Sequence, residues 1–264
     1  MPTIGPFRYL EAAASSRPRG TLVLLHAFPL SKRMWESQLS LAAHGWRVLA
    51  PDLRGFDGPA DEPPAASMDD YAGDVIDFMD ALHVRDAVLA GLSMGGYVAF
   101  AVLRHAASRV VGLVLADTRP DADTAEGVAG RRRMLTLLDD KGARGVADDM
   151  LPKLLGATTR ELRPAVGDRV RELILANPPG AIRGAIHAMM SRPDSTPDLA
   201  GIRCPTLILV GSEDAVTPPV VSEHMQRGIA GAELAVVPGS GHLSNLERPE
   251  VFNAAVAAFL TNRV

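Results

Sequence analysis

The chain has 264 residues, of which 47% are hydrophobic and 22% are charged, and its formal net charge is −4. A chain of this length and composition can bury a large apolar core, which excludes a disordered chain, a collagen and a coiled coil. The slightly acidic balance provides no basic surface of the kind that binds nucleic acid or anionic lipid.

Short apolar runs alternate with longer helical patterns along most of the chain. Continuous runs of about four to eight apolar residues are typical of strands buried on both faces. We predict strands at residues 7–13, 21–25, 46–50, 87–90, 110–116, 205–210 and 232–237. We predict helices at residues 34–43, 68–82, 95–106, 220–229 and 249–262. The alternation indicates an α/β fold with an open, mostly parallel sheet and helices on both faces.

Residues 118–197 break this alternation, because they contain no convincing strand. Helical patterns at 126–141, 143–155, 159–176 and 180–191 fill the segment instead. Its three consecutive arginines, at 131–133, are interpreted as a solvated face rather than an anion site. We therefore expect residues 1–117 and 198–264 to form a core and residues 118–197 to form an all-helical insertion.

The strongest chemical signal is the Gly-Leu-Ser-Met-Gly-Gly sequence at residues 91–96. It follows a predicted strand and opens a predicted helix, which is the setting of a nucleophile elbow. The flanking glycines let the strand and the helix approach closely while the serine occupies a strained turn. Ser93 is therefore the predicted nucleophile, at the sheet edge where open α/β sheets bind ligands.

A serine hydroxyl needs a base that takes its proton. Of the seven histidines, His242 lies in a glycine-bounded loop after the last predicted strand, and we predict that it is the base. Five others lie in or at the ends of helical patterns and are interpreted as surface or partly hydrogen-bonded side chains: His44, His83, His105, His187 and His224.

The base in turn needs an acid that orients it and stabilises the imidazolium. Asp214 fits this role, since it lies in the loop at 211–218 directly after a buried strand. Two alternatives remain open. Glu213 is adjacent, and Asp117 follows the strand at 110–116.

An oxyanion requires preformed backbone donors. The amide of Met94 would be one, at the start of a helix, where the helix dipole helps. The amide of Phe28, in the loop after the strand at 21–25, would be the second, because Pro29 has no N–H. His26 is interpreted as a structural residue that holds this loop, with direct catalysis as the alternative.

These motifs resemble those of the α/β-hydrolase family, in its small, capped, esterase-like group, over nearly the whole chain. Residues 26–29, His-Ala-Phe-Pro, are similar to the family's H-G-x-P oxyanion loop, with Ala27 in place of the usual glycine. Residues 51–56 are similar to its P-D-x-R-G-x segment. The resemblance implies an α/β-hydrolase fold with an all-helical cap inserted after the sixth strand. The N-terminal strand pair has only a weak sequence signal, which departs from the family's pattern and suggests a shortened sheet.

Two subgroups compete within this resemblance. Residues 91–96 and 242–247 are similar to 3-oxoadipate enol-lactonases. Residues 26–31 are closer to non-haem haloperoxidases, which are esterases with a perhydrolase side activity. In that subgroup a proline after the oxyanion-loop donor, here Pro29, accompanies peracid formation. A serine rather than an aspartate nucleophile argues against the chemistry of haloalkane dehalogenases and epoxide hydrolases.

The prediction is a cofactor-free serine hydrolase that cleaves a small carboxylic ester or lactone through an acyl-serine intermediate. Alternatives are C–C bond hydrolysis of a diketone, and a ligand receptor that retains the triad with little turnover. The sequence contains no metal-binding motif, phosphate loop or dinucleotide fingerprint.

The helical insertion would supply an apolar wall to the substrate pocket. The candidate residues are Leu151, Leu154, Leu155, Met189 and Met190. For the two methionines, a position in the hydrophobic core is an equally good interpretation. Trp35 could line the pocket entrance, but a position in the core is favoured.

Cys204 is the only cysteine, so no intramolecular disulfide can form, and we interpret it as a buried, inert thiol. Residues 1–10 lack the basic and apolar regions of a signal peptide. No apolar stretch is long enough to span a bilayer, so we expect a cytoplasmic protein. The sequence leaves the oligomeric state open.

Overall fold

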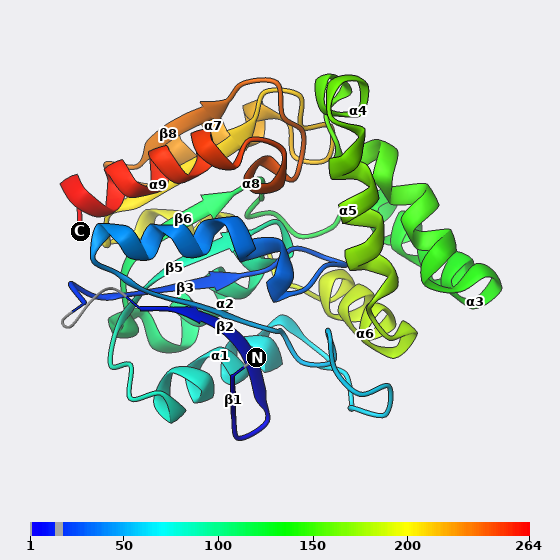
Figure 1. Cartoon of the computed structure of the whole chain (residues 1–264), viewed down its shortest axis with the longest axis horizontal. Coiled ribbons are helices and arrows are strands. Elements are labelled where there is room, and N and C mark those ends of the chain that lie inside the picture. The colour runs from blue at the N-terminus through cyan, green and yellow to red at the C-terminus, as the bar shows by residue number, and fades with distance from the viewer. Residues whose placement is uncertain (1, 14–17) are drawn as a thin grey trace.

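Eight strands form one mostly parallel sheet among residues 2–13 and 18–264, which the computed structural model describes (Figure 1). They are β1 (Thr3–Ile4), β2 (Phe7–Ala12), β3 (Thr21–Leu25), β4 (Arg47–Pro51), β5 (Ala87–Leu92), β6 (Val110–Ala116), β7 (Thr206–Gly211) and β8 (Glu233–Val237). Their spatial order is β1-β2-β4-β3-β5-β6-β7-β8. The pairs β1–β2 and β2–β4 are antiparallel and the others are parallel. The predicted fold is confirmed.

The N-terminal strands complete the sheet, so the expectation of a shortened sheet is wrong. Strand β2 pairs with β4 from Tyr9 opposite Pro51 to Ala12 opposite Val48. On one face its packing comes from aromatic residues, because the rings of Phe7 and Tyr9 lie 5.6 and 5.3 Å from the ring of Phe78, and on the other face Leu10 packs against the second core. Alternation of polar and apolar residues in β2 gives a weaker sequence signal than the continuous apolar runs of the central strands.

Successive residues of the central strands face two separate cores. In β3, Val23 and Leu25 pack in one core, and Leu22 and Leu24 pack in the other. The same alternation holds in β5, where Leu89 faces the first core. This period of two follows from strand geometry, and it explains why both faces must be covered by helices.

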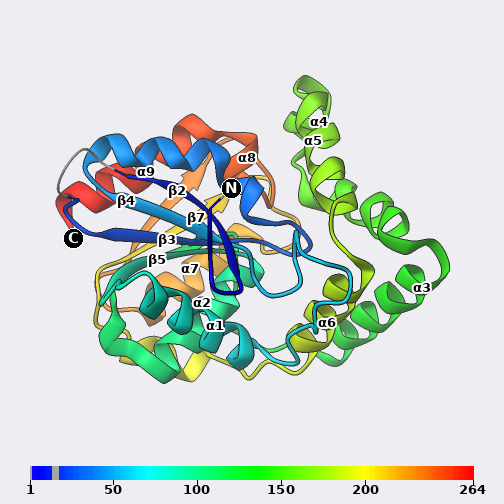
Figure 2. The ribbon, with the colours of Figure 1, turned by 60° about the horizontal axis from the view of Figure 1, so that its bottom comes forward.

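Helices cover both faces of the sheet (Figures 1 and 2). One face carries η1 (Lys32–His44), a 3₁₀ helix, and α9 (Pro249–Asn262). The other carries α1 (Met68–Ala81), α2 (Met94–Ala106) and α7 (Pro219–Gly228). Three short elements complete the core: η2 (Ala107–Arg109), η3 (Thr196–Gly201) and α8 (Ser244–Glu247). Helix α1 begins with a capping box, in which the Ser67 hydroxyl accepts from the Asp70 amide and the Asp70 carboxylate accepts from the Ser67 amide.

Residues 118–197, all of which are described, contain no strand. Their four α-helices are α3 (Ala125–Leu154), α4 (Ala157–Leu162), α5 (Pro164–Leu175) and α6 (Pro179–Met190). Helix α3 is broken at Gly142, whose φ of 62° is in the left-handed region, between the two helices expected from the sequence. Prolines at the first positions begin α5 and α6. We call residues 118–197 the helical insertion.

The helical insertion lies beyond the carboxyl ends of the parallel strands, beside the edge of the sheet where the turn between β5 and α2 lies (Figure 2). Its apolar side chains join both cores: Leu154 and Val170 pack in one, and Leu138 and Ile182 pack in the other. No helix among the described residues is long and apolar enough to cross a membrane.

Candidate active site

Ser93 occupies the sharp turn between β5 and α2, and it is partly exposed. Its φ of 54° and ψ of −113° are strained for a residue with a side chain. The turn is held by β6, because the Ser93 amide donates to the carbonyl of Ala116 at 2.9 Å. The hydroxyl of Thr118 donates to the Ser93 carbonyl at 2.8 Å. The strained serine is therefore fixed to the end of the neighbouring strand.

Steric limits explain the glycines of this turn. A Cβ on Gly95 would lie 2.1 Å from the carbonyl oxygen of Leu25, at the end of β3. A Cβ on Gly91 would lie 2.2 Å from the carbonyl oxygen of Gly95. No side chain fits at either position, as expected for a strand and a helix that approach so closely.

The structure brings the three predicted triad residues together. His242 Nε2 lies 2.8 Å from Ser93 Oγ, and His242 Nδ1 lies 2.8 Å from Asp214 Oδ2. Because Nδ1 faces a carboxylate, the neutral ring carries its proton there and presents Nε2 as an acceptor to the serine hydroxyl. The ring is buried, and its backbone amide donates to the carbonyl of Leu154 in the helical insertion at 2.9 Å.

Asp214 remains ionised although it is buried. The amides of Val216 and Thr217 donate to its Oδ1 at 2.8 and 2.9 Å, and the Thr217 hydroxyl donates to its Oδ2 at 2.7 Å. Burial favours the neutral acid, but the charge of His242 and these hydrogen bonds outweigh burial and lower the pKa of Asp214. Burial also favours neutral His242, yet the charge of Asp214 outweighs it and raises the pKa of the imidazole.

The two alternative acids have other partners. Asp117 accepts hydrogen bonds from the Gly211 amide at 2.8 Å and from the Ser244 amide at 3.2 Å, so it joins the end of β7 to the loop that carries His242. Burial and the charge of Asp214 raise the pKa of Asp117 to about 8. Glu213 points away and accepts from the amide of Thr158 in the helical insertion at 2.9 Å. The geometry favours Asp214 as the partner of His242.

The loop predicted to hold the second oxyanion donor is fixed by His26. The amide of Leu53 donates to His26 Nε2 at 3.0 Å, and His26 Nδ1 donates to the carbonyl of Ala27 at 3.0 Å. Burial lowers the pKa of His26 to about 4, so the ring is neutral near pH 7. Among the described residues, the amides of Phe28 and Met94 donate to no protein acceptor, which leaves both N–H groups for a ligand.

Sequence reasoning missed a polar cluster that supports this loop. Asn177, at the end of α5, donates through Nδ2 to the carbonyl of Pro29 at 2.8 Å and accepts at Oδ1 from the amide of Asp57 at 2.9 Å. The buried ammonium of Lys32 forms ion pairs with Asp52 and Asp57. A single asparagine between helical patterns gives no sequence signal for this contact.

The residues proposed for the pocket lie mostly in the cores. Trp35 is fully buried, and its ring lies 6.0 Å from that of Phe252. Met189 is buried in the core on the α1 and α2 side, and Met190 packs against the same core. Leu154 is also buried, but its carbonyl contacts the backbone of His242. This placement favours the core interpretation of Trp35 and of both methionines.

A cleft of about 520 Å³ lies between the helical insertion and the core, and Ser93, Asp214 and His242 are not among its lining residues. Its lining includes Leu154 and Thr217, which contact His242 and Asp214, and Tyr97, which lies one helical turn after Ser93. Among the described residues, no group of three or more His, Cys, Asp or Glu side chains could hold a metal ion.

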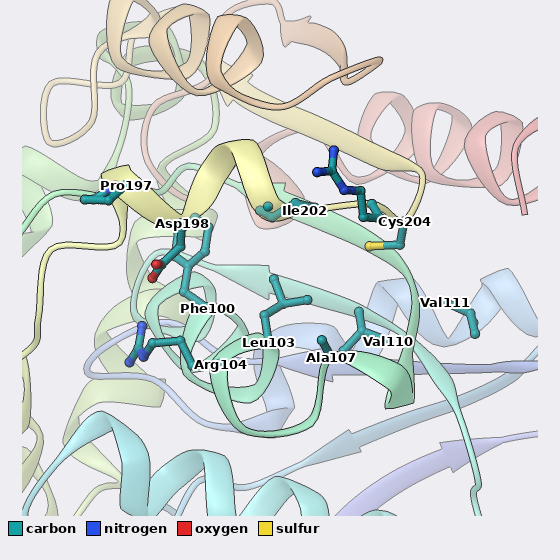
Figure 3. Close-up of a pocket in the computed structure, with 12 residues that line it drawn as sticks. Phe100, Leu103, Arg104, Ala107, Val110, Val111, Pro197, Asp198, Ile202 and Cys204 are labelled. Carbon is teal, nitrogen blue, oxygen red and sulfur yellow. The ribbon is translucent and has the colours of Figure 1, made fainter.

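A separate groove of about 930 Å³ lies at the opposite edge of the sheet, where β6 begins. Figure 3 shows Leu103 and Val110 on one side of it and Ile202 and Cys204 on the other. Cys204 is half-buried rather than fully buried, because it lines this open groove. Burial raises the pKa of its thiol, which disfavours the reactive thiolate.

Comparisons with known proteins agree with the observed fold. The sequence model of the alpha/beta hydrolase family matches residues 22–255 of this chain. The structure of a thermophilic esterase from Thermogutta terrifontis, with malate bound, is 37% identical, covers 97% of this chain and 93% of that chain, and has a TM-score of 0.91. The 3-oxoadipate enol-lactonase 1 of Acinetobacter baylyi is 29% identical over 86% of this chain and 83% of its own length.

A non-heme chloroperoxidase of Streptomyces lividans is 31% identical over 90% of this chain and 91% of its own length. The resemblance to both subgroups, which the sequence motifs indicated, is therefore confirmed.

The pH dependence of Ser93 reactivity tests the electrostatics of this site. His242 can take the Ser93 proton only while its imidazole is neutral, and its pKa is raised by Asp214. The rate at which a fluorophosphonate modifies Ser93 should therefore fall as the pH falls, with a midpoint above the ordinary histidine value of about 6.5. Asp214→Asn should lower the midpoint and slow the reaction at least about tenfold.

Asp140→Asn provides the matched control, since Asp140 is exposed on α3 and the substitution removes the same charge. It should leave the midpoint unchanged. A midpoint below about 6.5 in the unmodified protein, or one that Asp214→Asn does not move, would contradict the assignment of His242 and Asp214.

Proposed function

The chain belongs to the alpha/beta hydrolase family, and on that basis we propose that it cleaves a small carboxylic ester or lactone through an acyl-serine intermediate. One observation carries the proposal. Ser93 Oγ, His242 and Asp214 form a continuous chain of two 2.8 Å contacts at the carboxyl edge of the sheet. This is the arrangement that converts a serine hydroxyl into a nucleophile near neutral pH.

The first half-reaction acylates the serine. His242 Nε2 accepts the hydroxyl proton while Ser93 Oγ attacks the carbonyl carbon, and Asp214 stabilises the imidazolium that forms. The amides of Phe28 and Met94 donate to the developing oxyanion. The Met94 amide lies at the start of α2, where the helix dipole favours negative charge. The tetrahedral intermediate then collapses, and His242 returns the proton to the leaving alkoxide oxygen.

The second half-reaction releases the acid. Water takes the place of the leaving alcohol, or approaches beside the tethered alcohol of an opened lactone. His242 removes a proton from this water as it attacks the acyl carbonyl, and the second tetrahedral intermediate breaks down with protonation of Ser93 Oγ. The helical insertion serves as a cap over this chemistry, and its Leu154 carbonyl holds the backbone of His242.

Two related outcomes are supported by the comparisons. The Thermogutta protein is named an esterase and the Acinetobacter protein an enol-lactonase. The same triad chemistry serves both substrates. The acyl chain length that the protein accepts, and its preference for an open-chain ester or a lactone, then depend on the pocket rather than on the reacting groups.

Replacement of the nucleophile tests the proposal. Ser93→Ala should reduce turnover of p-nitrophenyl acetate at least about 10³-fold, because the acyl-enzyme can no longer form. It should also abolish fluorophosphonate labelling, measured by intact mass. Ser37→Ala, at an exposed position of η1, is the matched control and should retain full activity.

Retention of ester turnover by Ser93→Ala would refute the acyl-serine mechanism. Labelling of Ser93 without turnover of any ester would favour the alternative of a receptor that retains the triad.

Perhydrolysis is a second candidate activity, favoured by Pro29 in the oxyanion loop and by the chloroperoxidase relative. Hydrogen peroxide would replace water as the nucleophile that attacks the acyl-serine, and the product would be a peracid. The protein with acetate and hydrogen peroxide should then form peracetic acid, measured by oxidation of a halide, and Ser93→Ala should form none. Absence of peracid above the uncatalysed rate would exclude this activity.

A further inference from the structure

A buried carboxylate outside the triad binds the backbone of the His242 loop. Glu247, in α8, is fully buried. Its Oε1 accepts from the amide of Gly241 at 2.9 Å and from the amide of Leu243 at 3.2 Å. These two residues precede and follow His242 in the chain. One carboxylate oxygen therefore holds the backbone on both sides of the base.

The other oxygen of the same carboxylate reaches the helical insertion. Oε2 of Glu247 accepts from the amide of Gly156, which precedes α4, at 2.9 Å. The hydrogen-bond partners of this carboxylate among the described residues are thus three N–H donors. A neutral acid would direct its O–H at one of these donors, so the geometry favours the ionised form.

Glycines make the close contact between the insertion and the His242 loop possible. A Cβ on Gly241 would lie 2.3 Å from the nitrogen of Gly156. A Cβ on Gly211, at the end of β7, would lie 2.0 Å from the carbonyl oxygen of Gly241. Gly241 is therefore enclosed between the insertion and the strand that leads to Asp214. A shift of the insertion at this point would displace the residue next to His242.

Two further hydrogen bonds join the same segments. The amide of His242 donates to the carbonyl of Leu154 at 2.9 Å. The guanidinium of Arg163, between α4 and α5, donates to the backbone carbonyl of Glu247 at 2.5 Å. The insertion thus contacts the backbone of the base directly and reaches both of its neighbours through the Glu247 carboxylate.

The charge of Glu247 also acts on the imidazole of His242. Burial alone would lower the pKa of this imidazole, but the nearby charges of Asp214, Asp117 and Glu247 outweigh burial and raise it. Asp214 bonds the ring itself, whereas Asp117 binds the amide of Ser244 in the same loop.

We infer that Glu247 is a positioning residue for His242, because its carboxylate fixes the loop that carries the imidazole against Gly156 of the helical insertion. The inference rests on the proposed function and adds a residue to it. Glu247 exchanges no proton in the reaction. It keeps His242 Nε2 at its 2.8 Å distance from Ser93 Oγ, and the insertion supports the base through the same contact.

Glu247→Gln tests this role with little change in side-chain size. The glutamine has one acceptor oxygen, and its NH2 group must face either Gly156 or the amides beside His242, so at least one buried N–H loses its partner. The matched control is Glu250→Gln, which removes the same charge from an exposed position at the start of α9.

Turnover of p-nitrophenyl acetate is measured per Ser93 that a fluorophosphonate modifies at completion, so inactive molecules are not counted. Glu247→Gln should lower kcat about tenfold. It should leave KM within about twofold, since His242 serves both half-reactions and both should slow together. The pH midpoint of Ser93 modification should fall, because the imidazolium loses a nearby negative charge. Glu250→Gln should change none of these values.

Amide hydrogen exchange of the unmodified protein tests the contacts without a variant, so a misfolded Glu247→Gln does not block the test. After correction for intrinsic rates, the amides of Gly156, Gly241 and Leu243 should exchange at least about tenfold more slowly than that of the exposed Ala215. Exchange of these three amides as fast as that of Ala215 would overturn the inference.

An unchanged kcat or an unchanged midpoint in Glu247→Gln would also overturn it, even if the variant unfolded at a lower temperature, because the role of Glu247 would then be structural only. Ser93-dependent hydrolysis by the unmodified protein would leave the proposed function intact in either case. Absence of ester hydrolysis by the unmodified protein would count against the proposed function and, with it, against this inference.

Discussion

A buried negative charge on Asp214 is the constraint on which the site depends. Burial of a carboxylate costs several kcal/mol unless donors compensate for the lost water. Here two backbone amides and the Thr217 hydroxyl surround the carboxylate, and His242 completes the set. These groups come from the β7–α7 loop and from the loop after β8. The correct folding of both loops is therefore a condition for an activated Ser93.

The helical insertion also helps to hold these two loops in place, because hydrogen bonds join it to both of them. The buried carboxylate of Glu247 accepts from the Gly156 amide of the insertion and from the Gly241 amide next to His242, each at 2.9 Å. Asn177 makes a similar connection on the other side, through the carbonyl of Pro29 in the oxyanion loop. The insertion thus contributes polar contacts to the loop that carries His242, the proposed base, and to the loop that carries Phe28, the proposed oxyanion donor.

The sequence predicted the parts of the molecule that local physics determines. Continuous apolar runs identified the central strands, because residues such as Leu24 and Leu89 must be buried on both faces of a parallel sheet. The glycines around Ser93 were informative, since the close approach of strand and helix excludes a Cβ there. The positions of Asp214 and His242 in loops after predicted strands indicated them as partners of Ser93, although Asp117 and Glu213 remained open as alternative acids.

The sequence could not predict contacts that depend on packing between distant segments. Burial of Trp35 against Phe252 and of Met189 in the core follows from helix placement that hydrophobic periodicity does not specify. Asn177 gave no usable signal for the same reason. A polar residue between two helical patterns is assigned to solvent unless a distant partner is known.

Partition of the acyl group between water and methanol tests the central claim, formation of an acyl-Ser93, most directly. Two acetate esters with different alcohols, p-nitrophenyl and phenyl, are hydrolysed in buffer that contains methanol, and acetic acid and methyl acetate are quantified. A common acyl-enzyme predicts the same product ratio from both esters, whatever their relative rates. Product ratios that differ with the leaving group would show that water attacks the ester directly, and would contradict the account.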